Sequence, residues 1–135
     1  MRLLLDINVV LDVALNRQPW AADAAQILNA ADTARVVGYV AGHTITTAFY
    51  VISKAQGSQA ALVAVSDLLR FLDVVAVEKA DLHQAIALGM RDFEDAVQAA
   101  CALKVGADYI VTRNEKDFQG LPIAARSPGS ILPLI

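Results

Sequence analysis

The amino-acid sequence predicts an α/β fold in which a parallel central sheet of about four or five strands is sandwiched by helices. Short apolar runs alternate along the chain with longer segments in which apolar residues recur at helical spacing. The apolar runs lack the in-and-out alternation of half-exposed strands, which is typical of parallel strands covered on both faces. Gly and Pro number only 7 and 4, and no repeat, low-complexity tract or linker divides the 135 residues. We therefore expect residues 1–135 to form one domain.

The chain begins with an expected strand that is followed by two helices. Arg2–Asp6 is a short apolar run that ends in a carboxylate, which indicates a buried strand. Ile7–Asn16 carries apolar residues at helical spacing and is expected to form the first helix. Pro19 is expected to open a second helix that continues to about Ala31, because proline is tolerated in the first turn of a helix.

The middle of the chain indicates a second strand and a pair of helices. Arg35–Ala41 is rich in β-branched and aromatic residues, which favour strands. His43–Lys54 is expected to be helical, and Gly57 is expected to end that helix. Ser58–Phe71 forms the next expected helix, with Ser58 as its N-cap.

The last part of the chain continues the alternation of strands and helices. Asp73–Val77 is the third expected strand, and Lys79–Leu88 is the helix that follows it. Asp92–Val105 is an alanine-rich segment that is expected to form a helix leading directly into a fourth strand, Asp108–Thr112. Ile123–Ala125 is the candidate for a short fifth strand. This order predicts that helices connect the strands of a parallel sheet.

Composition excludes several classes of protein. Hydrophobic residues make up 56% of the chain, which excludes an intrinsically disordered protein. Cys101 is the only cysteine, which excludes an internal disulfide and a zinc site built from cysteines. The formal net charge of −3 argues against a protein that holds nucleic acid mainly through a basic surface. No apolar stretch reaches the roughly 18 residues of a membrane helix or resembles a signal peptide, so we expect no membrane association and a cytoplasmic location.

Acidic residues from three segments are expected at the same edge of the sheet. Asp6 ends the first strand, and Asp117 belongs to the polar segment after the fourth strand. Asp92 and Asp95 begin the helix that leads into that strand, so they too lie at the carboxyl edge. Helix capping is the alternative explanation for Asp6 and Asp92, and Asp12 is expected to be solvated. Convergent carboxylates favour a hard divalent cation, Mg²⁺ or Mn²⁺, because like charges otherwise destabilise the fold.

Three segments together resemble the PIN domain family: LLLDINVVLD at residues 3–12, RDFEDAVQAACA at 91–102 and GADYIVTRNEKDF at 106–118. The resemblance covers essentially the whole chain. It implies a parallel sheet sandwiched by helices and a metal-dependent cleavage of RNA that uses Mg²⁺ or Mn²⁺. The family includes the VapC-type toxins of bacterial and archaeal toxin–antitoxin pairs, so the resemblance also implies an antitoxin partner.

The resemblance implies a set of site residues. Asp6, Asp95 and Asp117 match the acidic positions of the family and are expected to be catalytic metal ligands. Asn114 matches a catalytic polar position just after the fourth strand, with capping of a short helical turn as the alternative. Thr112 matches a hydroxyl residue that supports the site. A water molecule activated by the metal would then attack the scissile phosphate of the RNA in line.

One position departs from the pattern of the family. The family often has a Glu early in the third helix, where this chain has Thr47, which predicts weaker metal binding and one metal ion rather than two. Asp92 and Glu94 are expected to support the site by supplying part of the missing charge. Arg113 and Lys116 are placed to bind the RNA backbone, although ordinary solvated charges are an equally good explanation.

The sequence leaves other functions and several partners open. With Thr47 in place of Glu, the domain could be a catalytically weak module that binds RNA or protein. A phosphatase of the haloacid-dehalogenase type is disfavoured because Asn8 stands where an acid/base Asp is needed, and a dehydrogenase because no glycine-rich loop follows the first strand. We expect a homodimer, which would give an acidic nuclease a shared RNA groove. An antitoxin is expected to dock as a helix in an apolar groove, and Trp20 is the best candidate for a partner surface.

Overall fold

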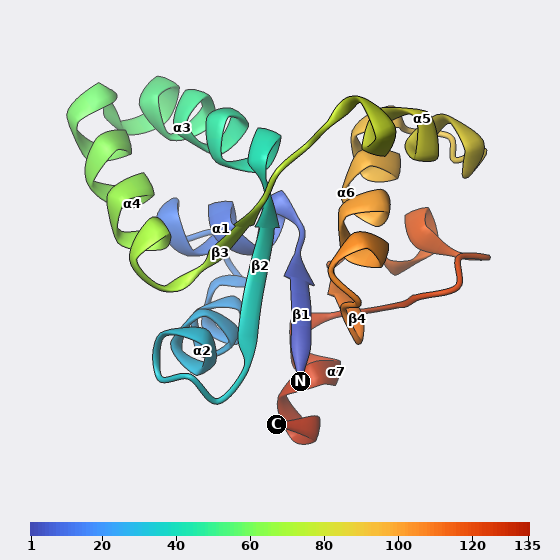
Figure 1. Ribbon diagram of the computed structural model, residues 1–135. Coiled ribbons are helices and arrows are strands. Elements are labelled where there is room, and N and C mark those ends of the chain that lie inside the picture. Colours follow the sequence, from blue (N-terminus) through green and yellow to red (C-terminus); the bar gives the residue numbers. More distant parts are fainter.

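Five parallel strands form one sheet in the computed structural model, which describes residues 1–135. The strand order is β3-β2-β1-β4-β5, with β1 at the centre (Figure 1). The strands are β1 (Arg2–Leu5), β2 (Val37–Ala41), β3 (Asp73–Val75), β4 (Tyr109–Val111) and β5 (Ala124–Arg126). Every neighbouring pair is parallel, so the carboxyl ends of all the strands lie at one edge of the sheet. The predicted fold class is confirmed.

Helices cover both faces of the sheet (Figure 1). The helices are α1 (Ile7–Ala14), α2 (Ala21–Asp32), α3 (Gly42–Gln56), α4 (Ser58–Phe71), α5 (Lys79–Ala87), α6 (Phe93–Lys104) and α7 (Pro128–Ile131), with 3₁₀ turns η1 (Glu115–Phe118) and η2 (Leu132–Leu134). Leu3 and Leu5 of β1 point into a core formed with α1 to α4 and α7, whereas Leu4 points into a core formed with α5 and α6. None of these helices combines the length and the apolar character needed to cross a membrane.

Two details of the predicted helix starts are wrong. Pro19 does not open the second helix, because residues 18–20 form a turn and α2 begins at Ala21. Ser58 is not an N-cap, because it is the first residue of α4 and no side chain caps that helix. Gly57 alone separates α3 from α4, and its φ of +93° is a conformation that favours glycine. Gly57 is therefore both the C-cap of α3 and the N-cap of α4, so Ser58 lies inside α4.

The third and fifth strands also differ from their predicted limits. β3 ends at Val75 rather than at Val77, because Val75 pairs with Ala41, the last residue of β2. α3 begins at Gly42, so no partner strand remains for residues beyond Val75. The short fifth strand exists and is displaced by one residue from its predicted position. The alternation of strands and helices is otherwise as predicted.

Candidate active site

The pairing of the two central strands brings Asp6 and Thr112 together at the carboxyl edge. Leu5 of β1 is in register with Val111 of β4, and the two polar residues follow directly. The Asp6 amide donates a hydrogen bond to the Val111 carbonyl at 2.9 Å, and Thr112 Oγ1 donates to Asp6 Oδ2 at 2.8 Å. The amide of Asn114 in turn donates to Thr112 Oγ1 at 3.0 Å. The strand register thus ties the segment after β4 to the carboxylate that ends β1.

Asp6 is a buried carboxylate with donors from three parts of the chain. Its Oδ1 atom accepts hydrogen bonds from the Ile7 amide at 2.8 Å and from Gln98 Nε2 at 3.0 Å, and its Oδ2 atom accepts the bond from Thr112. The residue is only 4% exposed. Asp6 does cap α1, as the capping explanation expects. The bonds from Thr112 and Gln98 exceed what capping requires, and they fix the orientation of the carboxylate.

Asp95 lies among the other acids at this edge. Burial, together with the negative charges of Asp92, Asp6, Asp117 and Glu94, raises the pKa of Asp95 to about 7. Asp92 is the N-cap of α6, since its Oδ1 atom accepts a hydrogen bond from the Asp95 amide at 3.0 Å. The structure therefore brings together the acids of all three predicted segments. Burial and the repulsion among these acids together favour a proton or a cation near Asp95 at neutral pH.

A polar cavity of about 680 Å³ opens beside these acids. It is lined by five residues, none of them hydrophobic: Arg91, Asp92, Asp95, Lys116 and Asp117. Lys116 is a predicted RNA contact, and the structure places it at this cavity. The sequence gives no reason to assign Arg91 a role, except that it immediately precedes the acidic run that begins α6. The cavity combines carboxylates with two cations, an arrangement suited to a phosphodiester held next to a metal ion.

The remaining predicted residues are more loosely connected to the acids. Asn114 is exposed and holds the N-cap position of η1, as the capping alternative expects, but its side chain makes no capping hydrogen bond. Thr47 is half-buried in α3 and lies one turn after His43. Glu94 is exposed, and its charge raises the pKa of His43, although burial lowers that pKa by more. His43 Nδ1 is buried without a hydrogen-bond partner.

Asp12 is buried rather than solvated, which corrects the expectation from the sequence. It is 2% exposed and forms ion pairs with Arg113 Nη2 at 3.5 Å and with Arg17 Nη1 at 3.8 Å. The guanidinium of Arg113 also lies 3.8 Å from the centre of the Trp20 ring. Burial raises the pKa of Asp12, and the charges of the two arginines oppose that rise. Arg113 is therefore held against α1 and Trp20, and it does not line the acidic cavity.

The acids suit a hard divalent cation by the chemistry of their donors. Every charged group that raises the pKa of Asp95 is a carboxylate, the ligand that Mg²⁺ and Mn²⁺ prefer. A cation at Asp95 would also relieve the repulsion described above. No three acidic, histidine or cysteine side chains surround a common point at ligand distance in this structure. The donor types and charges are thus suitable, and binding a metal would require the side chains to draw closer together.

Comparison with known proteins identifies the family. The model of the PIN domain matches residues 2–116. Ribonuclease VapC1 of Aquifex aeolicus (strain VF5) is 26% identical over 122 residues, which cover 87% of this chain and 83% of that protein.

Solved structures agree with the fold. VapBC-1 from nontypeable Haemophilus influenzae has a TM-score of 0.73 at 15% identity, covering 96% of this chain and 99% of that one. Mycobacterium tuberculosis VapC20, described as a sarcin–ricin loop cleaving toxin, has a TM-score of 0.71 at 16% identity, covering 88% of this chain and 95% of that one. Because the family model spans most of the residues, the chain belongs to the PIN domain family.

Proposed function

We propose that the chain is a Mg²⁺- or Mn²⁺-dependent ribonuclease that acts as the toxin of a toxin–antitoxin pair. The observation that carries the proposal is the gathering of Asp6, Asp92, Glu94, Asp95 and Asp117 at the carboxyl edge of the sheet. Capping accounts for Asp6 and Asp92 only. The similarity to a protein named as a ribonuclease supports the same conclusion.

In this proposal each part of the site has a distinct task. Asp6, Asp95 and Asp117 would hold the cation, and Thr112 with the backbone of α1 would keep Asp6 oriented. The cation, when bound, lowers the pKa of a water molecule and neutralises the scissile phosphate. Lys116 would bind the RNA backbone from the rim of the cavity. Water adds to phosphorus, the bond to the 3′ oxygen breaks, and the products are a 3′-hydroxyl and a 5′-phosphate.

Cleavage of a fluorogenic single-stranded RNA by the purified chain tests this proposal. We expect cleavage with Mn²⁺ or Mg²⁺, none with a chelator, and a loss of about a hundredfold or more in kcat/KM for Asp6→Asn and Asp117→Asn. Asp73→Asn is the matched control, because Asp73 is an exposed acid at the opposite edge of the sheet. RNA binding without cleavage in wild type would instead support the catalytically weak module that Thr47 leaves open. Light scattering of the same sample tests the expected homodimer.

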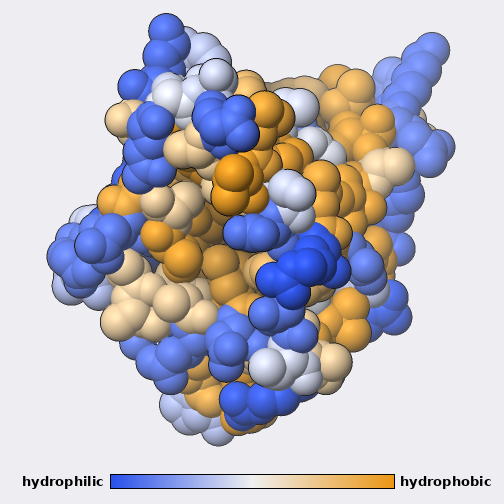
Figure 2. Space-filling model, turned by 90° about the vertical axis from the view of Figure 1, so that its left-hand side faces the viewer, coloured by the Kyte–Doolittle hydropathy of each residue, from blue (hydrophilic) through white to orange (hydrophobic).

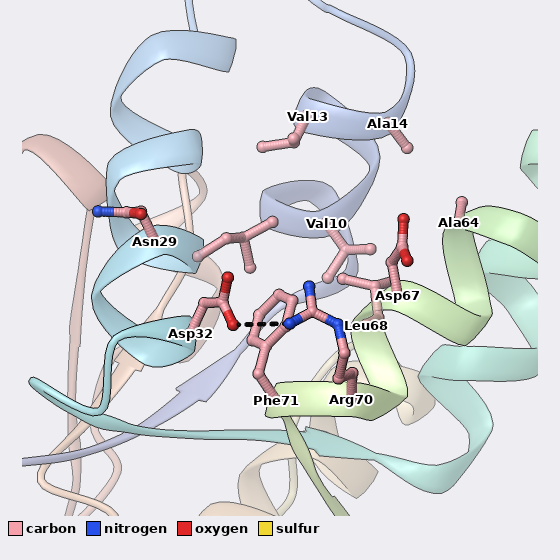
Figure 3. A pocket seen from close by; sticks show the side chains of 11 residues that line it. Val10, Val13, Ala14, Asn29, Asp32, Ala64, Asp67, Leu68, Arg70 and Phe71 are labelled. Atoms are coloured by element: carbon pink, nitrogen blue, oxygen red, sulfur yellow. Dashed lines mark hydrogen bonds and ion pairs between the residues drawn. The ribbon is translucent and has the colours of Figure 1, made fainter.

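An apolar groove between α1, α2 and α4 is the site we propose for the antitoxin. Figure 2 shows hydrophobic side chains gathered around a hollow on this face of the molecule. The cavity has a volume of about 400 Å³, and its hydrophobic lining includes Val10, Leu68 and Phe71 (Figure 3). Val10 lies one helical turn after Asp6, so a segment seated here would lie close to the start of α1. Several of the solved relatives are described as complexes of toxin and antitoxin, which supports such a partner.

The charges of the groove define the partner further. Arg70 pairs with Asp32 at 3.2 Å, whereas Asp67 lines the groove without an ion pair (Figure 3). We therefore expect an amphipathic helix with an apolar face and a basic residue opposite Asp67. Ala64→Arg in the lining should keep RNA cleavage and abolish inhibition by the protein encoded beside this chain's gene. Equal inhibition of Ala64→Arg and wild type would exclude this groove.

A further inference from the structure

Gln98 stands out in α6 as a polar side chain in a buried apolar segment. The helix buries Ala96, Val97 and the residues from Ala99 to Ala102, all of which have small or apolar side chains. Gln98 is buried with them and is only 3% exposed. A buried amide is unfavourable unless its polar atoms are hydrogen-bonded. An alanine or a valine would fit the pattern of this segment better, so the amide needs another explanation.

One half of the amide is explained by Asp6. Gln98 Nε2 donates a hydrogen bond to Asp6 Oδ1 at 3.0 Å, and both residues are buried. This bond fixes the orientation of the amide, because rotating it by half a turn would place its oxygen against the carboxylate. The bond links residues that are 92 positions apart in the chain. Gln98 therefore joins α6 to the carboxyl end of β1 at the acidic site.

The other half of the amide has no partner. Gln98 Oε1 is buried and makes no hydrogen bond with any atom of the protein. Because both atoms belong to one planar amide, Oε1 lies close to the Nε2 atom that contacts Asp6. Gln98 also follows Asp95 by three residues, so both side chains lie along one side of α6. The unpaired acceptor thus belongs to a side chain that contacts the acidic site directly.

We propose that Gln98 is a positioning residue of the acidic site. Its amide nitrogen holds Asp6 in place, and its amide oxygen accepts a hydrogen bond from a water molecule bound between Asp6 and Asp95. This inference rests on the proposed metal-dependent function. A neutral oxygen adds a hydrogen-bond acceptor without adding to the repulsion that surrounds Asp95.

Two variants with opposite predictions test the role of Gln98. In Gln98→Leu the side chain keeps its bulk and loses both polar atoms, so Mn²⁺ affinity and kcat should each fall by about 10- to 100-fold, with KM for the fluorogenic RNA nearly unchanged. In Gln98→Glu the new carboxylate repels Asp6 in the metal-free protein, so the melting temperature should fall. The same carboxylate faces the bound cation, so Mn²⁺ should bind about tenfold more tightly and restore the melting temperature.

The measurements are titration calorimetry with Mn²⁺, thermal unfolding with and without Mn²⁺, and steady-state cleavage. Gln84→Leu on α5 is the control, because Gln84 is exposed and lies on a different helix. A Gln98→Leu variant that keeps wild-type Mn²⁺ affinity and kcat would reduce Gln98 to a packing role. A Gln98→Glu variant that is destabilised without any gain in Mn²⁺ affinity would show that Oε1 does not face the site. Wild-type protein that neither binds Mn²⁺ nor cleaves RNA would overturn the proposed function itself, an outcome visible before any Gln98 variant is tested.

Discussion

Removing the charge of Asp95 should stabilise the metal-free protein at neutral and alkaline pH. Burial and the neighbouring carboxylates raise the pKa of Asp95 from 3.8 to about 7. Between these two values the folded protein keeps a proton that the unfolded chain releases. The free energy of unfolding therefore falls as the pH rises from about 4 to about 7. Above that range Asp95 is ionised in both states and causes no further fall. The Asp95→Asn protein does not lose this stability, so the difference between its free energy of unfolding and that of wild type should grow as the pH rises through the same range.

The size of the effect follows from the raised pKa and from the exposure of the side chain. A rise of one in a pKa corresponds to about 1.4 kcal/mol, so the full rise sets an upper limit of about 4 kcal/mol on the lost stability. The carboxyl group is only half-buried, and solvent and salt screen the repulsion from its exposed neighbours. We therefore expect a gain of about 1–2 kcal/mol near pH 8, or about 4–7 °C in melting temperature.

Thermal and urea unfolding of wild type and Asp95→Asn across this pH range would measure the effect. The control is Asp73→Asn, in which an exposed acid is neutralised at the other edge of the sheet. Mg²⁺ or Mn²⁺ should close the gap at pH 8 by stabilising wild type alone. A difference between wild type and Asp95→Asn that is the same at pH 4 and pH 8 would refute the reasoning, because repulsion at a titrating carboxylate cannot be independent of pH.

Three other substitutions test separate parts of the structure. Trp20→Ala should lower the free energy of unfolding by about 1–2 kcal/mol. Because Trp20 and Arg113 stabilise one contact, Arg113→Ala should cost less stability in the Trp20→Ala background than in wild type. Additive losses in this double-mutant cycle would show that the two side chains act separately. Gly38→Ala should lower the free energy of unfolding by about 1–3 kcal/mol, because a Cβ atom there would lie 2.7 Å from Leu72 Cδ2. A wild-type free energy of unfolding in urea would contradict this packing. Thr44→Val should raise stability by about 1 kcal/mol in thermal unfolding, since the Thr44 hydroxyl is buried without a partner; a lower melting temperature would mean that the hydroxyl has a partner after all.

The sequence contains enough local information to predict the sheet and the acids at its edge. Apolar runs and helical spacing predict the order of the elements, and parallel strands must end at the same edge. Asp6, at the end of the first strand, can be placed there from these rules alone. The parallel arrangement also places the start of α6 at the carboxyl edge of the sheet, because that helix leads directly into β4. These are consequences of short-range patterns combined with one rule of topology.

Contacts between distant segments cannot be predicted in the same way. Asp12 has the position of a solvated residue in a helix, yet it is buried beside Arg113 from the other end of the chain. Gln98 gives no signal of its own, since a single polar residue in an alanine-rich helix is usually exposed. Its bond to Asp6 depends on how closely α6 packs against β1, which the pattern of residues does not specify. The start of α2 depends likewise on the path of a turn rather than on the preference of Pro19.

The central claim is that the carboxylates at the sheet edge bind a divalent cation that is needed to cleave RNA. The most direct test is calorimetric titration of Mn²⁺ into wild type and Asp6→Asn, with cleavage of a fluorogenic single-stranded RNA followed in the same samples. The account predicts that wild type binds Mn²⁺ and cleaves, whereas Asp6→Asn does neither while remaining folded. Wild-type protein that binds no Mn²⁺ at millimolar concentration, together with a higher melting temperature for Asp6→Asn, would contradict it.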